Sequence, residues 1–164
     1  VKAKAAVLMD VGTGKVLMSM NADEKLYPAS VTKIMTLLLV TEALDSGKIT
    51  LGDTVTASSS AASKGGSQIW LKEGEQMTVD DLIKACVVMS ANDAAVVLAE
   101  AVAGSEDAFV ERMNARAAEL GMNDTVFKNC NGLDEDGHIT SAYDVAVMSR
   151  ALMQHEKIFD YTLI

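Results

Sequence analysis

The chain has 164 residues and a formal net charge of −9, and 49% of its residues are hydrophobic although only three Tyr, three Phe and one Trp are aromatic. This length predicts a single domain with a core of its own, and the core must be built mainly from aliphatic side chains and methionine, which suits packed helices. The acidic balance argues against a nucleic-acid partner, because phosphate binding requires clustered Lys and Arg. No apolar run approaches the ~18 residues of a membrane-spanning helix.

The N-terminal stretch "AKAAVLMDVGTGKVLMSM" predicts two strands joined by a turn at Gly12 and Gly14. Two strands alone are only marginally stable, so this hairpin is expected to belong to a larger sheet. A helix is expected to begin close to Pro28, because proline suits the first helical turn, and to end at Gly47. The buried face of this helix is predicted to comprise Ile34, Leu37, Leu38, Thr41 and Leu44.

Four further helices are predicted along the rest of the chain. Residues 51–67 are small and polar, which predicts a loop with one short strand. Thr78 is expected to cap the helix in "TVDDLIKACVVMS", and the nearly all-apolar "NDAAVVLAEAVAG" predicts a central helix. An amphipathic helix is expected between Ser105 and Gly121, and a last helix between Ser141 and about His155. The inward face of the last helix is predicted to comprise Ala142, Val145, Ala146, Met148 and Leu152.

A serine and a lysine three residues apart form the first candidate site, in "PASVTKIMT". On a helix, Ser30 and Lys33 would share a face, so the Lys33 amine would reach the Ser30 hydroxyl. A lysine among apolar neighbours has its ammonium form disfavoured and can act as a base, while a serine near a helix N-terminus lies beside free N–H groups. The bland alternative is that Ser30 caps the helix and Lys33 extends to water.

A second polar pair lies in "VVMSANDAAVVLAE", at the predicted break between two apolar helices. Polar groups at such a break either cap a helix or line a cleft. Asn92 would be able to hydrogen-bond a substrate amide, and Ser90 would be able to relay a proton. Capping accounts for Ser90 alone, but it does not account for both pairs in this order.

The two motifs together resemble those of the low-molecular-mass penicillin-binding proteins, the serine-type D-alanyl-D-alanine carboxypeptidases of the S11 peptidase family, which carry S-x-x-K, S-x-N and K-T-G. The likeness extends to "AAVLMDVGTGKVL", "LKEGEQMTVDDLI", "FVERMNARAAELGM", "TVFKNCNGL" and "HITSAYDVAVMSRAL", so it covers nearly the whole chain. The resemblance implies an α/β fold of the DD-peptidase/β-lactamase type and removal of the terminal D-Ala from peptidoglycan stem peptides.

The resemblance also implies a role for each motif residue. Ser30 would be the acylated nucleophile and Lys33 its base, Ser90 would transfer the proton, and Asn92 would bind the substrate's peptide bond. The Ser30 N–H would supply half of the oxyanion hole. β-Lactam antibiotics would be covalent inhibitors, and no cofactor or metal is implied. The family works outside the cytoplasm after loss of a leader peptide, and "VKAKAAVLMD" itself shows no secretory signal.

The third motif of the family is missing, because no K-T-G or K-S-G string occurs in the sequence. In the family this motif lies on a central strand of the sheet, which also lines the oxyanion hole and carries the cation for the substrate carboxylate. Residues 1–164 are therefore expected to be the N-terminal portion of a single transpeptidase-like domain, a hairpin plus a mostly helical part, whose remaining strands lie beyond the chain or in a separate chain. Alone, this portion is expected to be inactive.

Two other functions stay open at this stage. A class A β-lactamase needs a glutamate that activates the deacylating water, often within E-x-x-N, and Glu111 and Asn114 form such a string. They fall, however, within a predicted amphipathic helix, and the second motif is S-A-N where those enzymes usually show S-D-N. The other alternative is a non-catalytic module that binds cell-wall peptide.

The remaining chemical signals are interpreted as structural. Cys86 and Cys130 fit no metal pattern; Cys86 is interpreted as a buried free thiol, and a bridge between the two is left open. His138 and His155 lack the spacing of metal ligands, and they are expected in a surface loop and at a helix end.

Overall fold

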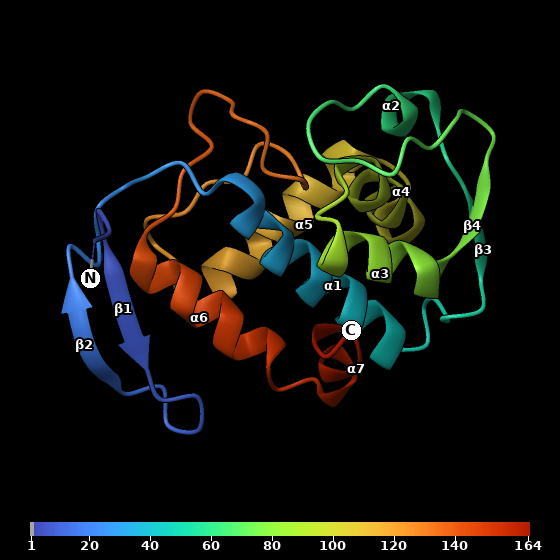
Figure 1. Cartoon of the computed structure of the whole chain (residues 1–164). Helices are drawn as coiled ribbons and strands as arrows, with labels where there is room; N and C mark the ends of the chain where they lie inside the picture. The colour runs from blue at the N-terminus through green and yellow to red at the C-terminus, as the bar shows by residue number, and fades with distance from the viewer. Residues whose placement is uncertain (1) are drawn as a thin grey trace.

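A body of helices carries one hairpin on its left side and a second, smaller one on its right in Figure 1. The computed structural model describes residues 2–164. In chain order the elements are β1 (Ala6–Met9), β2 (Val16–Met20), the 3-10 turn η1 (Ala29–Thr32), α1 (Lys33–Asp45), β3 (Thr54–Thr56), α2 (Ser59–Ala62), β4 (Gln76–Thr78), α3 (Val79–Val88), α4 (Asn92–Ala103), α5 (Glu106–Glu119), α6 (Ala142–Leu152), the 3-10 turn η2 (Glu156–Ile158) and α7 (Phe159–Thr162).

The predicted N-terminal hairpin is confirmed. β1 and β2 pair antiparallel, with Ala6 opposite Met20, and Gly14 in the turn has a φ of +74°. One side of the hairpin lies against α6, as Figure 1 shows. Leu8 and Leu17 are 53% and 59% exposed, so apolar side chains that would suit a larger sheet face solvent.

The predicted first helix divides into a 3-10 turn, η1, and the α-helix α1. Gly47, with a φ of +72°, follows its end as predicted. The prediction of a single buried face is wrong, since the buried residues of α1 lie all around it. The reason is its central place in the fold, where α4, α5 and α6 pack against it.

The caps of the next helices are confirmed. The side chain of Thr78 accepts a hydrogen bond from the N–H of Asp81 at the start of α3, and Ser105 accepts one from the N–H of Ala108 at the start of α5. α4 is buried over nearly its whole length, as its apolar sequence predicted. The starts of α3 and α5 and the burial of α4 therefore follow largely from local sequence.

Three features were not predicted. β4 pairs with β3 in a second two-stranded sheet, the short helix α2 interrupts the polar stretch 51–67, and α7 packs against α3 near the C-terminus.

The predicted inward face of α6 is only partly confirmed, because Met148 and Leu152 are buried but the other predicted inward residues are only half-buried. These half-buried residues are Ala142, Val145 and Ala146.

Candidate functional site

Ser30 lies in η1, immediately before α1. The preceding residue, Ala29, has a φ of +48°, a left-handed conformation that non-glycine residues rarely adopt. The backbone N–H of Lys33 donates to the carbonyl of Ser30. Residues three apart eclipse in a 3-10 turn, so Ser30 and Lys33 lie on the same side of η1. Ser30 is exposed, which is compatible with its predicted role as a nucleophile.

Lys33 does not extend to water, so the bland interpretation of this residue is wrong. Its side chain is buried, with an exposed fraction of 4%. Its Nζ donates to Oδ1 of Asn92 at 2.6 Å and to the carbonyl oxygen of Asn131 at 2.8 Å. Burial lowers the pKa of Lys33 below its ordinary value of 10.5, because the charged form loses its hydration. No ion pair joins Lys33 to a carboxylate within residues 2–164.

The number of acceptors around Nζ suits an uncharged amine. A neutral amine has two N–H groups and one lone pair, and the two N–H groups match the two oxygens of Asn92 and Asn131. The lone pair is then left free to accept a proton. The hydrogen bonds of the Lys33 amine within residues 2–164 go to these two acceptors, so neither Ser30 nor Ser90 is bonded to it.

Ser90 and Asn92 lie at the break between α3 and α4, as predicted. Ser90 is half-buried and has a φ of +54°. Asn92 is 4% exposed and is held by the loop before β4: its N–H donates to the carbonyl of Ser67 at 2.7 Å, and its Nδ2 donates to the carbonyl of Gly65 at 2.8 Å. These contacts orient the amide so that its oxygen faces Lys33.

The loop 129–133 is a third wall of the site, and the sequence analysis did not identify it. Asn131 supplies the second acceptor for Lys33, and its own Nδ2 is buried without a hydrogen-bond partner in the part of the chain that the structure describes. Gly132 has a φ of +94°, and a Cβ there would overlap the carbonyl of Ala29 and lie 3.0 Å from the N–H nitrogen of Ser30. The string "NCNGL" contains the signal, an Asn-Gly turn, but the sequence does not say where that turn packs.

His138 is not in a surface loop as predicted, since it is 1% exposed. Its Nδ1 accepts the backbone N–H of Lys128 at 2.9 Å, so Nε2 carries the proton and donates to Oγ1 of Thr32 at 2.8 Å. This bond ties the loop before α6 to η1. His155, by contrast, lies beyond the end of α6, as predicted, and contacts Asp45.

The two cysteines are free and buried, and no disulfide joins them. The interpretation of Cys86 as a buried thiol is therefore confirmed. Burial raises the pKa of Cys86 to about 12. Both thiols are thus protonated at neutral pH, since burial also raises the pKa of Cys130.

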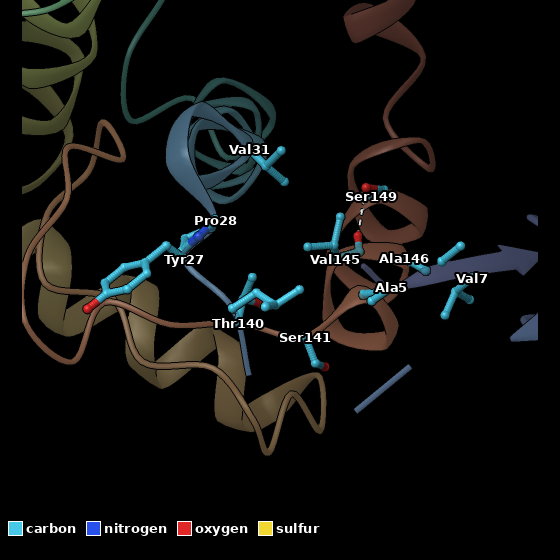
Figure 2. Close-up of a pocket in the computed structure, with 13 residues that line it drawn as sticks. Ala5, Val7, Tyr27, Pro28, Val31, Thr140, Ser141, Val145, Ala146 and Ser149 are labelled. Atoms are coloured by element: carbon cyan, nitrogen blue, oxygen red, sulfur yellow. Dashed lines mark hydrogen bonds between the residues drawn. The ribbon is translucent and has the colours of Figure 1, made fainter. Parts of the chain in front are cut away.

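A groove of about 450 Å³ lies beside η1, between the first hairpin and α6. Figure 2 shows Val31, the residue after Ser30, facing Val145 and Ala146 of α6, with Val7 of β1 to the right of Ala146. The half-buried face of α6 described above forms one wall. Neither Ser30 nor Lys33 is among the lining residues, so the groove adjoins the candidate site through Val31 without containing it.

Comparison with known proteins now identifies the family. The family model of the S11 peptidases, described as D-alanyl-D-alanine carboxypeptidase, matches residues 1–163. The chain therefore belongs to the S11 family of D-alanyl-D-alanine carboxypeptidases. Its fold is accordingly the α/β fold of the DD-peptidases, as predicted, in a shortened form.

Three relatives illustrate the similarity. The D-alanyl-D-alanine carboxypeptidase DacF of Bacillus subtilis is 53% identical over 98% of this chain, which covers 41% of DacF. The crystal structure of DacD from Francisella tularensis has a TM-score of 0.95 and 35% identity, over 99% of this chain and 40% of that one. Penicillin-binding protein D2 from Listeria monocytogenes, in its ampicillin-bound form, has a TM-score of 0.84 and 31% identity, over 98% and 65% of the two chains. The chain spans about two fifths of the length of the first two.

Proposed function

We propose that the full-length protein carrying this chain is a serine-type carboxypeptidase that removes the terminal D-Ala of peptidoglycan stem peptides. The observation that carries the proposal is the buried Lys33 amine, held by Asn92 and Asn131 on the same side of η1 as the exposed Ser30. A lysine whose pKa is lowered by burial is suited to activate a serine hydroxyl. Membership of the family supplies the substrate class.

The proposed reaction has two steps. Lys33 takes the proton of the Ser30 hydroxyl while Oγ attacks the carbonyl between the two D-Ala residues, and the Ser30 N–H stabilises the oxyanion. Ser90 passes the proton to the departing D-Ala amine as the C–N bond breaks, and Asn92 binds the amide of the substrate. Water then cleaves the Ser30 ester, which releases the shortened peptide and restores the hydroxyl.

The remaining parts of the site are proposed to come from the rest of the full-length protein. Two requirements are not met by the residues already placed: the second N–H of the oxyanion hole and a cation for the substrate's carboxylate. We assign both to the third motif of the family, K-T-G, on a strand that packs along the groove beside η1, in the same polypeptide or as a separate chain. The half-buried residues of the first hairpin and of α6 support this place, because they form apolar walls of the groove that reaches Val31, the residue after Ser30.

A class A β-lactamase is not favoured. Glu111 is exposed on α5. Asn114 is occupied elsewhere, since its side chain bonds both the N–H and the carbonyl of Phe127 at 2.9 Å. This pair therefore fastens α5 to a neighbouring loop instead of orienting a water molecule at Ser30.

The proposed place of action is the bacterial cell envelope, outside the cytoplasm, because peptidoglycan stem peptides are cross-linked there. Within residues 2–164, no helix has the length and apolar character that crossing a bilayer requires. The proposed location therefore rests on the substrate class alone.

The test is acylation of the full-length protein by a labelled penicillin. We expect one label per molecule, on the peptide that contains Ser30, and none on the Ser30→Ala variant. Ser60→Ala, at an exposed position of α2, is the control and should label like the unchanged protein. A label on another peptide, or rapid release of hydrolysed penicillin, would contradict the proposal.

A further inference from the structure

A half-buried ion pair lies outside the proposed catalytic residues. Lys64, in the loop after α2, donates from Nζ to Oε2 of Glu106 at 2.7 Å, and the side chains are 22% and 15% exposed. Among the ion pairs of residues 2–164, no other is so little exposed at both partners. Because desolvation of two charges is costly, a pair in such a place calls for additional hydrogen bonds.

Glu106 has these additional bonds through its other oxygen. Oε1 accepts the backbone N–H of Cys130 at 3.4 Å and its thiol at 3.3 Å. Cys130 is fully buried, so its N–H has no water to bond and depends on this acceptor. One carboxylate therefore joins the loop after α2 to the loop 129–133.

Each of these loops also holds the amine of Lys33. Gly65, next to Lys64, accepts the Asn92 amide whose oxygen bonds Nζ. Asn131, next to Cys130, gives its carbonyl to Nζ directly. The contacts form a closed ring from Lys33 through both loops, and Glu106 is the group that closes it on the far side.

We propose that Glu106 is a positioning residue that holds the two acceptors of the Lys33 amine at a fixed separation. Glu106 touches neither Lys33 nor, in the proposed reaction, the substrate, so its effect passes through Asn92 and Asn131. This inference rests on the proposed function, because the separation of the two acceptors affects the reaction only if Lys33 is the base for Ser30.

Loss of the ring has a specific chemical consequence. Without the Glu106 carboxylate, Lys64 loses its counter-charge and the Cys130 N–H loses its acceptor, so both loops are free to move apart. Water then reaches Nζ, and the pKa of Lys33 rises toward its ordinary value. The titratable groups that influence Lys33 are the thiols of Cys86 on α3 and of Cys130, and burial, the largest cause of the raised pKa of each thiol, does not depend on the Glu106 carboxylate.

The experiment compares Glu106→Ala and Glu106→Gln in the full-length protein, with Asp107→Ala as the control. Asp107 lies beside Glu106 in the first turn of α5 and is exposed, so its removal takes away the same charge without opening the ring. The readouts are the rate of acylation by a labelled penicillin across a range of pH and the thermal midpoint of each variant.

For Glu106→Ala we expect acylation at neutral pH to fall by at least about tenfold, as displaced catalytic groups typically cause. The acidic limb of its pH profile should shift to higher pH by about half a unit or more, since the lysine is less desolvated. Glu106→Gln keeps an acceptor for the Cys130 N–H but no counter-charge for Lys64, so its rate and the position of its limb should lie between those of Glu106→Ala and the unchanged protein. Asp107→Ala should behave like the unchanged protein.

The outcomes separate this inference from the proposed function. An unchanged protein that is not acylated at Ser30 would refute the proposed function, and the inference with it. If the unchanged protein is acylated but the acidic limb of the Glu106→Ala acylation profile lies at the same pH as that of the unchanged protein, the proposed function stands and the positioning role is refuted. A lower thermal midpoint for Glu106→Ala without a shift of its acidic limb also refutes the positioning role, because it indicates that the ion pair only stabilises the fold.

Discussion

At the scale of single residues, the surroundings of Lys33 decide what the site can do. The amine has two oxygen acceptors, little solvent and no carboxylate partner within residues 2–164. A lysine paired with a carboxylate would stay charged, whereas this one has its pKa lowered by burial. The structure thus increases the share of the neutral form, which can accept a proton, relative to a lysine in water.

This state of Lys33 predicts the pH dependence of acylation in the full-length protein. The base works only when neutral, so the acylation rate should rise with pH along a limb that lies below the ordinary value of 10.5. Lys33→Ala should lower the rate by about 10²- to 10⁴-fold, the usual contribution of a general base. Lys48→Ala, at an exposed position, is the control and should be acylated like the unchanged protein. A rate that climbs only near pH 10.5 would contradict the prediction.

His138 predicts an acid-sensitive contribution to stability. Burial lowers its pKa below 6.5, and its Nδ1 must stay unprotonated to accept the Lys128 N–H. The unfolded chain therefore binds the proton more readily, so this contribution is complete above about pH 6.5 and is lost as the pH falls below it.

Urea unfolding of the full-length protein at pH 7.5 and pH 5 checks this linkage. His138→Gln should be less stable at pH 7.5 by about 1–3 kcal/mol, the cost of leaving buried groups without partners. It should also lose less stability between the two pH values than the unchanged protein does. Equal losses in both proteins would show that His138 does not titrate as the structure indicates.

At the scale of elements, the site is assembled by loops that fix the ends of helices. η1 places Ser30 and Lys33, the break between α3 and α4 places Ser90 and Asn92, and the loop 129–133 packs on η1. Left-handed backbone conformations occur at Ala29, at Ser90 and at Gly132, one in each of these segments. For Ala29 and Ser90, which are not glycines, this conformation is strained and persists only where surrounding contacts hold it, which is typical of functional sites.

Gly132→Ala tests the contact between the loop 129–133 and η1. A Cβ at this position would overlap the Ala29 carbonyl, so the Ser30 backbone must shift and acylation should fall by about tenfold or more. Gly121→Ala is the matched control, because Gly121 has a similar φ of +75° but nothing within 4 Å of its Cβ position. Both variants carry backbone strain of about 1–3 kcal/mol, measured by urea unfolding, but only Gly132→Ala should lose acylation. Equal acylation rates would contradict this role of the loop.

At the scale of the whole molecule, two apolar surfaces adjoin the proposed nucleophile. Residues 5–7 at the start of the first hairpin and the half-buried face of α6 line the groove, which reaches Val31, the residue after Ser30 (Figure 2). The relatives DacF and DacD are more than twice as long as the matched segment. Both observations support a site that is completed by further strands.

This arrangement predicts that residues 1–164 alone react poorly with penicillin. The isolated chain should be acylated about 10²- to 10³-fold more slowly than the full-length protein, because loss of an oxyanion donor has that effect. Mass spectrometry of the Ser30 peptide measures the label, and circular dichroism checks that the isolated chain is helical. Stoichiometric acylation without the rest of the protein would overturn the prediction.

Much of this chain was predictable from local sequence. Thr78 and Ser105 mark helix starts, Gly14 and Gly47 mark a turn and a helix end, and the two motifs identify the family, because caps, turns and short motifs depend on residues close together in the chain. The sequence alone also placed Ser90 and Asn92 at a helix break.

The tertiary structure decided what depends on distant contacts. Asn131 and Glu106 act on Lys33 from segments far along the chain, His138 is buried against Thr32, and α1 is covered on all sides. A sequence pattern reports periodicity within one element, but it does not report which loop packs on which helix end. For this protein the sequence determined which groups are proposed to carry the chemistry, and packing decided that Lys33, one of these groups, is desolvated and has a lowered pKa.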